Sequence, residues 1–143
     1  QVCHYDLDRL ILSIAGGKCT GKPAFGSAPA ACAISATKEN LEANQIVPGS
    51  MEVLIGNIID DKEVQDQVGY EKYDIVTANI LADVLVPLTP VIWHQMKRGG
   101  IYITSGIIDE KEKTVAEAVK KAGMEILEIT RQGEWVCIIA RKN

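Results

Sequence analysis

The sequence lacks paired cysteines, a long apolar segment and an excess of basic residues. Its cysteines, Cys3, Cys19, Cys32 and Cys137, are scattered without a C-x-x-C pair or a metal-binding histidine spacing, so we expect no metal site. Free, mostly buried thiols in a reducing compartment are the favoured interpretation. No apolar run is long enough to span a bilayer and there is no signal peptide, which predicts a cytoplasmic protein without a membrane partner.

The chain has 143 residues, of which 47% are hydrophobic and 24% charged, and this composition suits one soluble globular domain with a single core. The net charge of -4 argues against direct nucleic-acid binding but leaves a basic protein as a possible substrate. The isolated histidines, His4 and His94, favour a structural or exposed role over a catalytic one. No internal repeat is evident, and nothing in the sequence predicts an oligomeric state.

Residues 72–82 form the stretch around which the other segments are best arranged. A run of β-branched and apolar residues, 75–78, is typical of a strand buried on both faces of a parallel sheet. The run stops at Asn79, and open α/β sheets bind their ligands at the carboxyl ends of such strands. An amide both donates and accepts hydrogen bonds, which suits ligand binding. The alternative interpretation is that Asn79 caps the next helix.

Patterns along the rest of the chain alternate between the two periodicities. We expect strands at 51–55, 73–79 and 101–104, helices at 27–44, 81–96 and 110–122, a short helix or loop at 60–68, and a strand at 2–5 as one possibility. Two strands at 124–130 and 134–140 form a terminal hairpin. The order predicts an α/β fold with a parallel sheet, helices on both faces and a C-terminal antiparallel hairpin, the arrangement of class I (Rossmann-like) methyltransferases.

Three local details of the helices are also predicted. Pro87 and Pro90 fall inside the second long helix, which should therefore be kinked or split. Asp109 and Glu112 have the spacing of a capping box at the start of the last helix. Gly123 suits the position that follows the last residue of this helix.

Four segments resemble the ribosomal protein L11 methyltransferase (PrmA) family. They are Ala36–Asn40, Asp74–Ala82 with its Asn-Ile-Leu-Ala signature, Lys97–Gly100 followed by Ser105–Ile107, and Gly133–Val136. The resemblance runs from Ser35 to Arg141. It implies an S-adenosylmethionine-dependent methyltransferase that transfers methyl groups to lysine side-chain and α-amino groups of a ribosomal protein.

The resemblance also implies roles for single residues. Asn79 and the backbone carbonyl of Ile80 would accept hydrogen bonds from the target amine and contact the cofactor. Asn57 would contact the adenine, and Ser27 would lie near the ribose. Trp135 would either line the pocket or pack in the core, and general burial statistics favour the core.

The sequence departs from the family in the segments that contact the cofactor. The family's glycine-rich turn falls at residues 4–10, which contain no glycine, and Ser27 stands where an acidic residue is usual. The chain is expected to be a single methyltransferase-like domain, 1–143, without the family's N-terminal recognition domain. A cofactor-free scaffold or interaction domain is therefore the alternative function. Residues 16–22 match a phosphate-binding loop, but Pro23 replaces its magnesium-binding hydroxyl.

Overall fold

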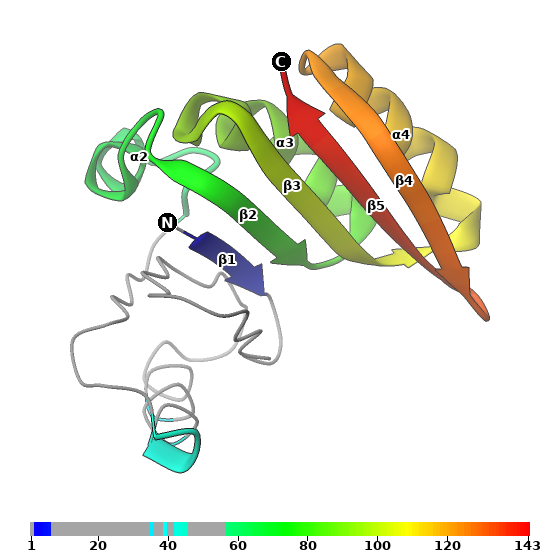
Figure 1. The fold of residues 1–143 in the computed structure, drawn as a ribbon, viewed down its shortest axis with the longest axis horizontal. Helices are drawn as coiled ribbons and strands as arrows, with labels where there is room; N and C mark the ends of the chain where they lie inside the picture. The colour runs from blue at the N-terminus through cyan, green and yellow to red at the C-terminus, as the bar shows by residue number, and fades with distance from the viewer. Residues whose placement is uncertain (1, 7–34, 36–38, 40–41, 46–56) are drawn as a thin grey trace.

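The computed structural model describes residues 2–6, 35, 39, 42–45 and 57–143. The described residues form one five-stranded sheet in the order β1-β2-β3-β5-β4 (Figure 1). Its first three strands are parallel, and β5 is antiparallel to both of its neighbours. The strands are β1 (Val2–Asp6), β2 (Tyr73–Asn79), β3 (Met96–Ile108), β4 (Met124–Gln132) and β5 (Trp135–Lys142). This topology confirms the predicted α/β fold with a terminal antiparallel hairpin.

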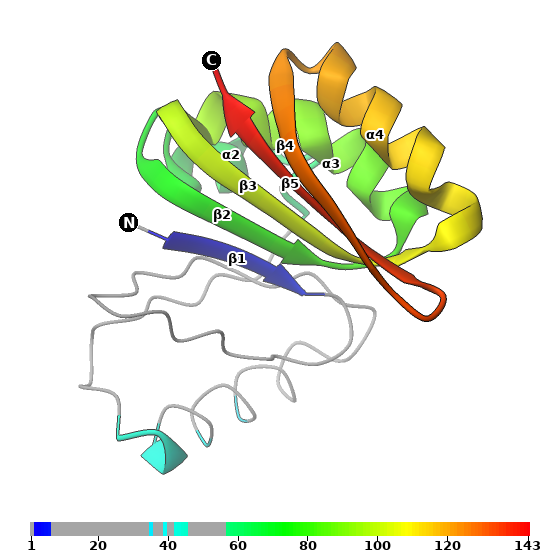
Figure 2. The same cartoon turned by 45° about the vertical axis from the view of Figure 1, so that its right-hand side comes forward.

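Within residues 57–143, three α-helices lie on the same side of the sheet (Figure 2). They are α2 (Lys62–Val68), α3 (Ala82–Gln95) and α4 (Glu112–Lys121). The helix expected at 27–44 lies mostly outside the described residues, but Ser35, Glu39, Glu42 and Ala43 are helical as predicted. The strand expected at 51–55 lies outside them entirely. In the part of the chain that the structure describes, no helix has the length and apolar character needed to cross a membrane.

The central strand β2 has the predicted bounds, but its two faces differ in burial. Val76 and Ala78 are buried against α3 and lie opposite Tyr102 and Thr104 of β3. The side chains that alternate with them are only half-buried. Burial on both faces is therefore incomplete. The strand still provides the centre of the core, which its inward residues share with α3 and α4.

Strand β3 is longer than the predicted 101–104 because it tolerates two irregularities. Its register with β2 shifts between Tyr73 and Ile75, so that residues 97–100 form a bulge opposite the single residue Asp74. Lys97 of this bulge donates to Asp74 Oδ1 at 2.7 Å, and the ammonium group lowers the pKa of Asp74 to about 2. A second bulge lies between Thr104 and Ile107. The backbone thus absorbs the glycine-containing segments without ending the strand.

Of the two outcomes predicted for the proline-containing helix, a kink or a split, the structure contradicts the split. Pro87 and Pro90 both lie inside one 14-residue helix. Both prolines are exposed, so water has access to the side of the helix where they remove backbone donors. The opposite side packs against the sheet, where Leu85, Leu88 and Ile92 are fully buried. Tertiary packing of this apolar stripe outweighs the local preference of proline.

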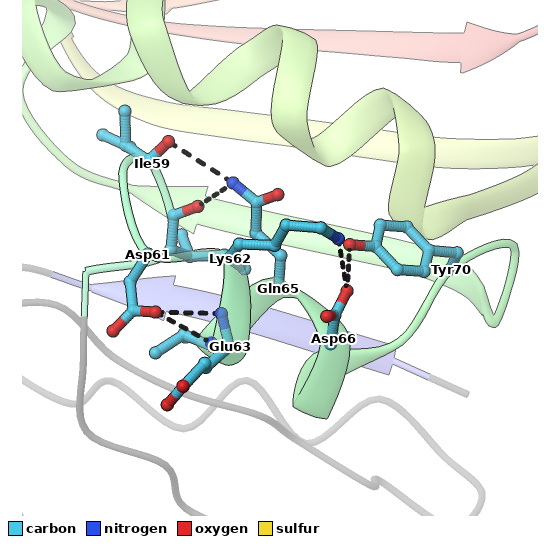
Figure 3. A network of polar contacts seen from close by, with 9 residues as sticks. Ile59, Asp61, Lys62, Glu63, Gln65, Asp66 and Tyr70 are labelled. Atoms are coloured by element: carbon cyan, nitrogen blue, oxygen red, sulfur yellow. Dashed lines mark hydrogen bonds and ion pairs between the residues drawn. The ribbon is translucent and has the colours of Figure 1, made fainter.

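The segment 60–68, predicted as a short helix or loop, contains helix α2, and Figure 3 shows the polar contacts that hold this helix. The Asp61 carboxylate caps α2 by accepting hydrogen bonds from the backbone N–H groups of Glu63 and Val64. Gln65 Nε2 donates to the carbonyl oxygen of Ile58 at 2.8 Å and ties the helix to the preceding turn. Both contacts satisfy backbone groups at or just before the start of the helix with residues close in sequence, and they stabilise a helix of only seven residues.

The start of α4 also differs from the prediction. A 3₁₀ turn, Asp109–Lys111, precedes the helix, and no side chain caps it. Asp109 Oδ1 accepts a hydrogen bond from the N–H of Glu110, while Glu112 forms two hydrogen bonds with Arg131 of the hairpin. The capping-box prediction is therefore wrong. The bidentate pair of the Glu112 carboxylate with the Arg131 guanidinium is stronger than a hydrogen bond from Glu112 to a backbone N–H group. Gly123 follows the helix with φ 88°, as predicted.

Among the described residues, Lys142 is the one charged residue that is buried, with only 2% of its surface exposed. Its Nζ donates to the carbonyl oxygens of Trp93 and Met96, each at 2.8 Å, and lies 3.9 Å from the centroid of the Trp93 ring. Burial lowers the pKa of this ammonium group, and the nearby carboxylate of Glu71 partly opposes the shift. The contacts join the end of β5 to the carboxyl end of α3.

We expect Lys142→Met to lower the free energy of unfolding by about 1–3 kcal/mol, because two buried carbonyl groups lose their donor while the alkyl chain remains. The matched control is Lys97→Met, which removes an exposed ammonium group and should change stability by less than about 1 kcal/mol. Urea denaturation of both variants measures the difference. Equal losses for the two lysines would contradict the role assigned to Lys142.

Candidate functional site

The parallel pairing of β1, β2 and β3 ends at one edge of the sheet, although β3 itself continues to Ile108 beside β5. Asp6 of β1, Asn79 of β2 and Ser105 of β3 occupy matching register positions. The chain leaves this edge through the segment 80–81 that leads into α3 (Figure 1). Open α/β sheets bind ligands at this carboxyl edge, so the register places the predicted residue Asn79 where a site is expected.

The side chain of Asn79 is held by its neighbour across the sheet. Ser105 Oγ donates a hydrogen bond to Asn79 Oδ1 at 3.0 Å. The backbone carbonyl of Ser105 accepts from the N–H of Ile80 at 3.2 Å, which extends the pairing one residue past the strand. Asn79 is half-buried, whereas the side chain of Ile80 is buried at 5% exposure. Ile80 therefore offers only its backbone to a ligand.

The helix-cap interpretation of Asn79 is wrong. The N-cap position of α3 belongs to Leu81, and no side chain makes a capping hydrogen bond there. The N–H groups of Val84 and Leu85 instead donate to the carbonyl oxygen of Leu81. Asn79 lies two residues before this cap. Its amide is therefore available for a role other than starting the helix.

Gly106 lies directly against the amide and the backbone that follows it. Its φ is 75°, and a Cβ added there would lie 3.0 Å from Asn79 Oδ1, 3.1 Å from the carbonyl oxygen of Ile80 and 3.2 Å from the Ile80 nitrogen. The two predicted acceptor oxygens are thus gathered around one point. A side chain at position 106 would compete with them for this space.

The other predicted cofactor residues are less clearly placed. Asn57 is exposed, and its amide makes two local hydrogen bonds: Nδ2 donates to Asp60 Oδ2, and Oδ1 accepts from the N–H of Ile59. These contacts form the turn before α2, so adenine contact by Asn57 stays a prediction. Ser27, the glycine-free segment after Asp6 and the phosphate-loop pattern at 16–23 lie outside the described residues.

Trp135 is not a core residue, contrary to the favoured interpretation. Its side chain is 51% exposed at the first position of β5, opposite Ile108 at 38% exposure. The inward positions of β5 alternate with it and are occupied by Val136, Ile138 and Ala140. The strand period therefore directs Trp135 to the surface, beside the last residue of β3. The pocket-lining interpretation remains a prediction.

Asn79 and the Ile80 carbonyl can orient a bound group through hydrogen bonds, but neither can transfer a proton as an acid or base. Neither the Asn79 amide nor the Ile80 carbonyl titrates near neutral pH, and both oxygens accept hydrogen bonds. Such a pair suits an amino group that must be held in one direction. Sequence reasoning assigned Asn79 and Ile80 but gave no role to Ser105 and Gly106. Both residues directly follow the strand predicted at 101–104, and this position was the sequence signal that could have identified them.

Comparisons with known proteins identify the family to which the sequence is similar. Residues 10–143 match the sequence profile described as ribosomal protein L11 methyltransferase (PrmA). The ribosomal protein L11 methyltransferase of Lachnospira eligens is 56% identical over 93% of this chain, and that of Agathobacter rectalis is 48% identical over 92%. The chain spans only 42% and 41% of the lengths of these two relatives.

Solved structures support the fold. A ribosomal protein L11 methylase from Lactobacillus delbrueckii subsp. bulgaricus superposes with a TM-score of 0.69 at 22% identity, covering 87% of this chain and 58% of that one. A putative methyltransferase from Thermoplasma acidophilum gives a TM-score of 0.71 at 16% identity, covering 99% and 67% of the two chains. The fold is therefore that of class I methyltransferases.

Proposed function

Because the chain belongs to the ribosomal protein L11 methyltransferase (PrmA) family, we propose that it is the catalytic part of an S-adenosylmethionine-dependent enzyme that methylates amino groups of ribosomal protein L11. The observation that carries the proposal is the pair of acceptor oxygens, Asn79 Oδ1 and the Ile80 carbonyl, gathered at the carboxyl edge of the parallel strands. Both residues lie within the part of the chain that matches the family.

The residues at this edge fit a cofactor that must approach the backbone closely. Gly106 leaves open the space that a Cβ would fill beside Asn79 and Ile80. Asn79 and the backbone of Ile80 would contact the bound cofactor from the end of β2. Asn57 retains a second amide N–H for the adenine, and Ser27 would lie near the ribose. When bound, S-adenosylmethionine supplies an electrophilic methyl group on a sulfonium.

The chain's own contribution to the reaction is to hold the acceptor amine. A neutral amine attacks through its lone pair, so its N–H groups must point away from the methyl group. Asn79 Oδ1 and the Ile80 carbonyl oxygen accept hydrogen bonds from these N–H groups and direct the lone pair. Oδ1 already accepts from Ser105, but a carbonyl oxygen has a second lone pair for the amine. The exposed Trp135 ring would line the entrance for the acceptor side chain.

The alternative function, a cofactor-free scaffold, is not favoured. It rested on the glycine-free segment at residues 4–10 and on Ser27. Most of that segment precedes the family match, which begins at residue 10, and His4, Tyr5 and Asp6 belong to strand β1. The match includes Ser27, so the missing acidic residue is the stronger of the two departures. The contacts around Asn79 favour a working site.

Calorimetric titration with S-adenosylhomocysteine tests the proposal, using protein whose intact mass agrees with the sequence. We expect one site with micromolar affinity, and transfer of labelled methyl groups from S-adenosylmethionine to purified ribosomal protein L11. Binding without transfer to L11 would restrict the proposal to the cofactor. Failure of protein of the correct mass to bind would overturn the enzyme proposal in favour of the scaffold.

A further inference from the structure

The hydrogen bond between Ser105 and Asn79 has a role that the fold alone does not require. The two strands are already joined by backbone pairing, including the bond from the Ile80 N–H to the Ser105 carbonyl. The side-chain bond from Ser105 Oγ to Asn79 Oδ1 adds little to that register. It instead fixes the orientation of a terminal amide, whose last torsion is otherwise broad and roughly two-fold.

A bulge in β3 places the hydroxyl where this bond forms. Thr104 and Ile107 pair with Ile138 and Val136 of β5, so the two residues between them lie opposite the single residue Cys137. The second of the two residues is glycine with φ 75°, which allows the extra residue to be accommodated. Bulges of this kind redirect side chains next to binding sites. Here the bulge preserves the register of Ser105 with Asn79 while β3 remains paired with β5.

We propose that Ser105 is a positioning residue for Asn79, and this inference rests on the proposed methyl transfer. By donating to Oδ1, the hydroxyl holds that oxygen beside the Ile80 carbonyl. The two oxygens lie around the space that a Cβ of residue 106 would fill, which we call the Gly106 cradle. Nδ2 of the same amide then points to the other side. A freely rotating amide would present its donor to the amine for part of the time, and an N–H group opposed to another N–H group cannot orient the lone pair.

The test compares Ser105→Ala with Ser105→Thr, which keeps the hydroxyl. Thr104→Val is the matched control, because Thr104 Oγ1 donates to the Ile138 carbonyl on the other face of the same strand. We expect Ser105→Ala to lower kcat for L11 methylation roughly five- to tenfold, as for the loss of one hydrogen bond, with KM and S-adenosylhomocysteine affinity within about twofold. Ser105→Thr should restore kcat, and Thr104→Val should leave it unchanged.

A second readout does not depend on activity. The ¹⁵N order parameter of the Asn79 side-chain amide, assigned by the loss of its signal in Asn79→Asp, should fall in Ser105→Ala and remain high in Ser105→Thr. An unchanged order parameter in Ser105→Ala, or a lower one with unchanged kcat, would overturn the positioning role. If the unsubstituted protein transfers no methyl group, the proposed function fails, and the positioning role that rests on it fails as well. The order parameter then still decides whether the contact exists.

Discussion

Replacing Asn79 by alanine should lower kcat for methylation of L11 by about 10²- to 10³-fold, the effect of losing one preorganised group that orients the reacting atoms. The change removes Oδ1, one of the two acceptors at the Gly106 cradle, and leaves only the Ile80 carbonyl to direct the amine. KM for L11 should change by a few-fold at most, because an interaction that orients the amine for attack contributes to the transition state more than to binding. Steady-state kinetics with labelled S-adenosylmethionine measure both constants.

Asn79→Asp is the isosteric comparison for this experiment. The carboxylate keeps two acceptor oxygens but adds a negative charge, which stabilises the protonated, unreactive form of the amine. We expect this variant to regain activity as the pH is raised, whereas Asn79→Ala should not. An alanine variant with kcat near that of the unsubstituted protein would show that Asn79 does not orient the acceptor.

The sequence was sufficient where local pattern and tertiary structure agree. The β-branched and apolar run 75–78 led to the prediction of a strand at 73–79, which are the bounds of β2, because such residues fit a pleated surface that is at least half-buried. The polar residue at the end of this strand identified the edge on which the candidate site lies. Residues 2–5, which gave only a weak strand pattern, form β1 because β2 offers a parallel partner.

Sequence reasoning failed where a distant partner decides the outcome. Glu112 had the spacing of a capping box, yet its carboxylate pairs with Arg131, 19 residues away. No local pattern drew attention to Lys142, because its acceptors, the carbonyls of Trp93 and Met96, lie 49 and 46 residues away. The fold creates those acceptors at the carboxyl end of α3, so no local window contains the information.

In the candidate site, too, some residues could be predicted from local sequence and others depend on distant partners. Asn79 and Ile80 were accessible to sequence reasoning because they follow a recognisable strand. Ser105 and Gly106 were recognised as part of a segment that resembles the family, but their contacts with Asn79 depend on the register between β2 and β3. Register is specified by the whole set of inward-facing residues on the two strands and not by any single motif.

Gly106→Ala should cause the largest loss of stability among the substitutions at this edge. A φ of 75° is unfavourable for alanine by about 1–2 kcal/mol. The new Cβ would also lie 3.0 Å from Asn79 Oδ1 and 3.1 Å from the Ile80 carbonyl, and relieving this overlap costs a further ~1–3 kcal/mol. The free energy of unfolding should therefore fall by about 2–5 kcal/mol, and kcat should fall because Oδ1 is displaced.

Gly99→Ala separates the cost of the positive φ angle from the cost of steric overlap. Gly99 has nearly the same φ, 74°, but a Cβ added there meets nothing within 4 Å. This control should lose only the backbone contribution of about 1–2 kcal/mol and should retain full kcat. Urea denaturation and methylation kinetics of both variants measure the contrast. If the two glycines prove equally sensitive, the cradle is not tightly packed, and the acceptor oxygens of Asn79 and Ile80 are not held around one point as the structure places them.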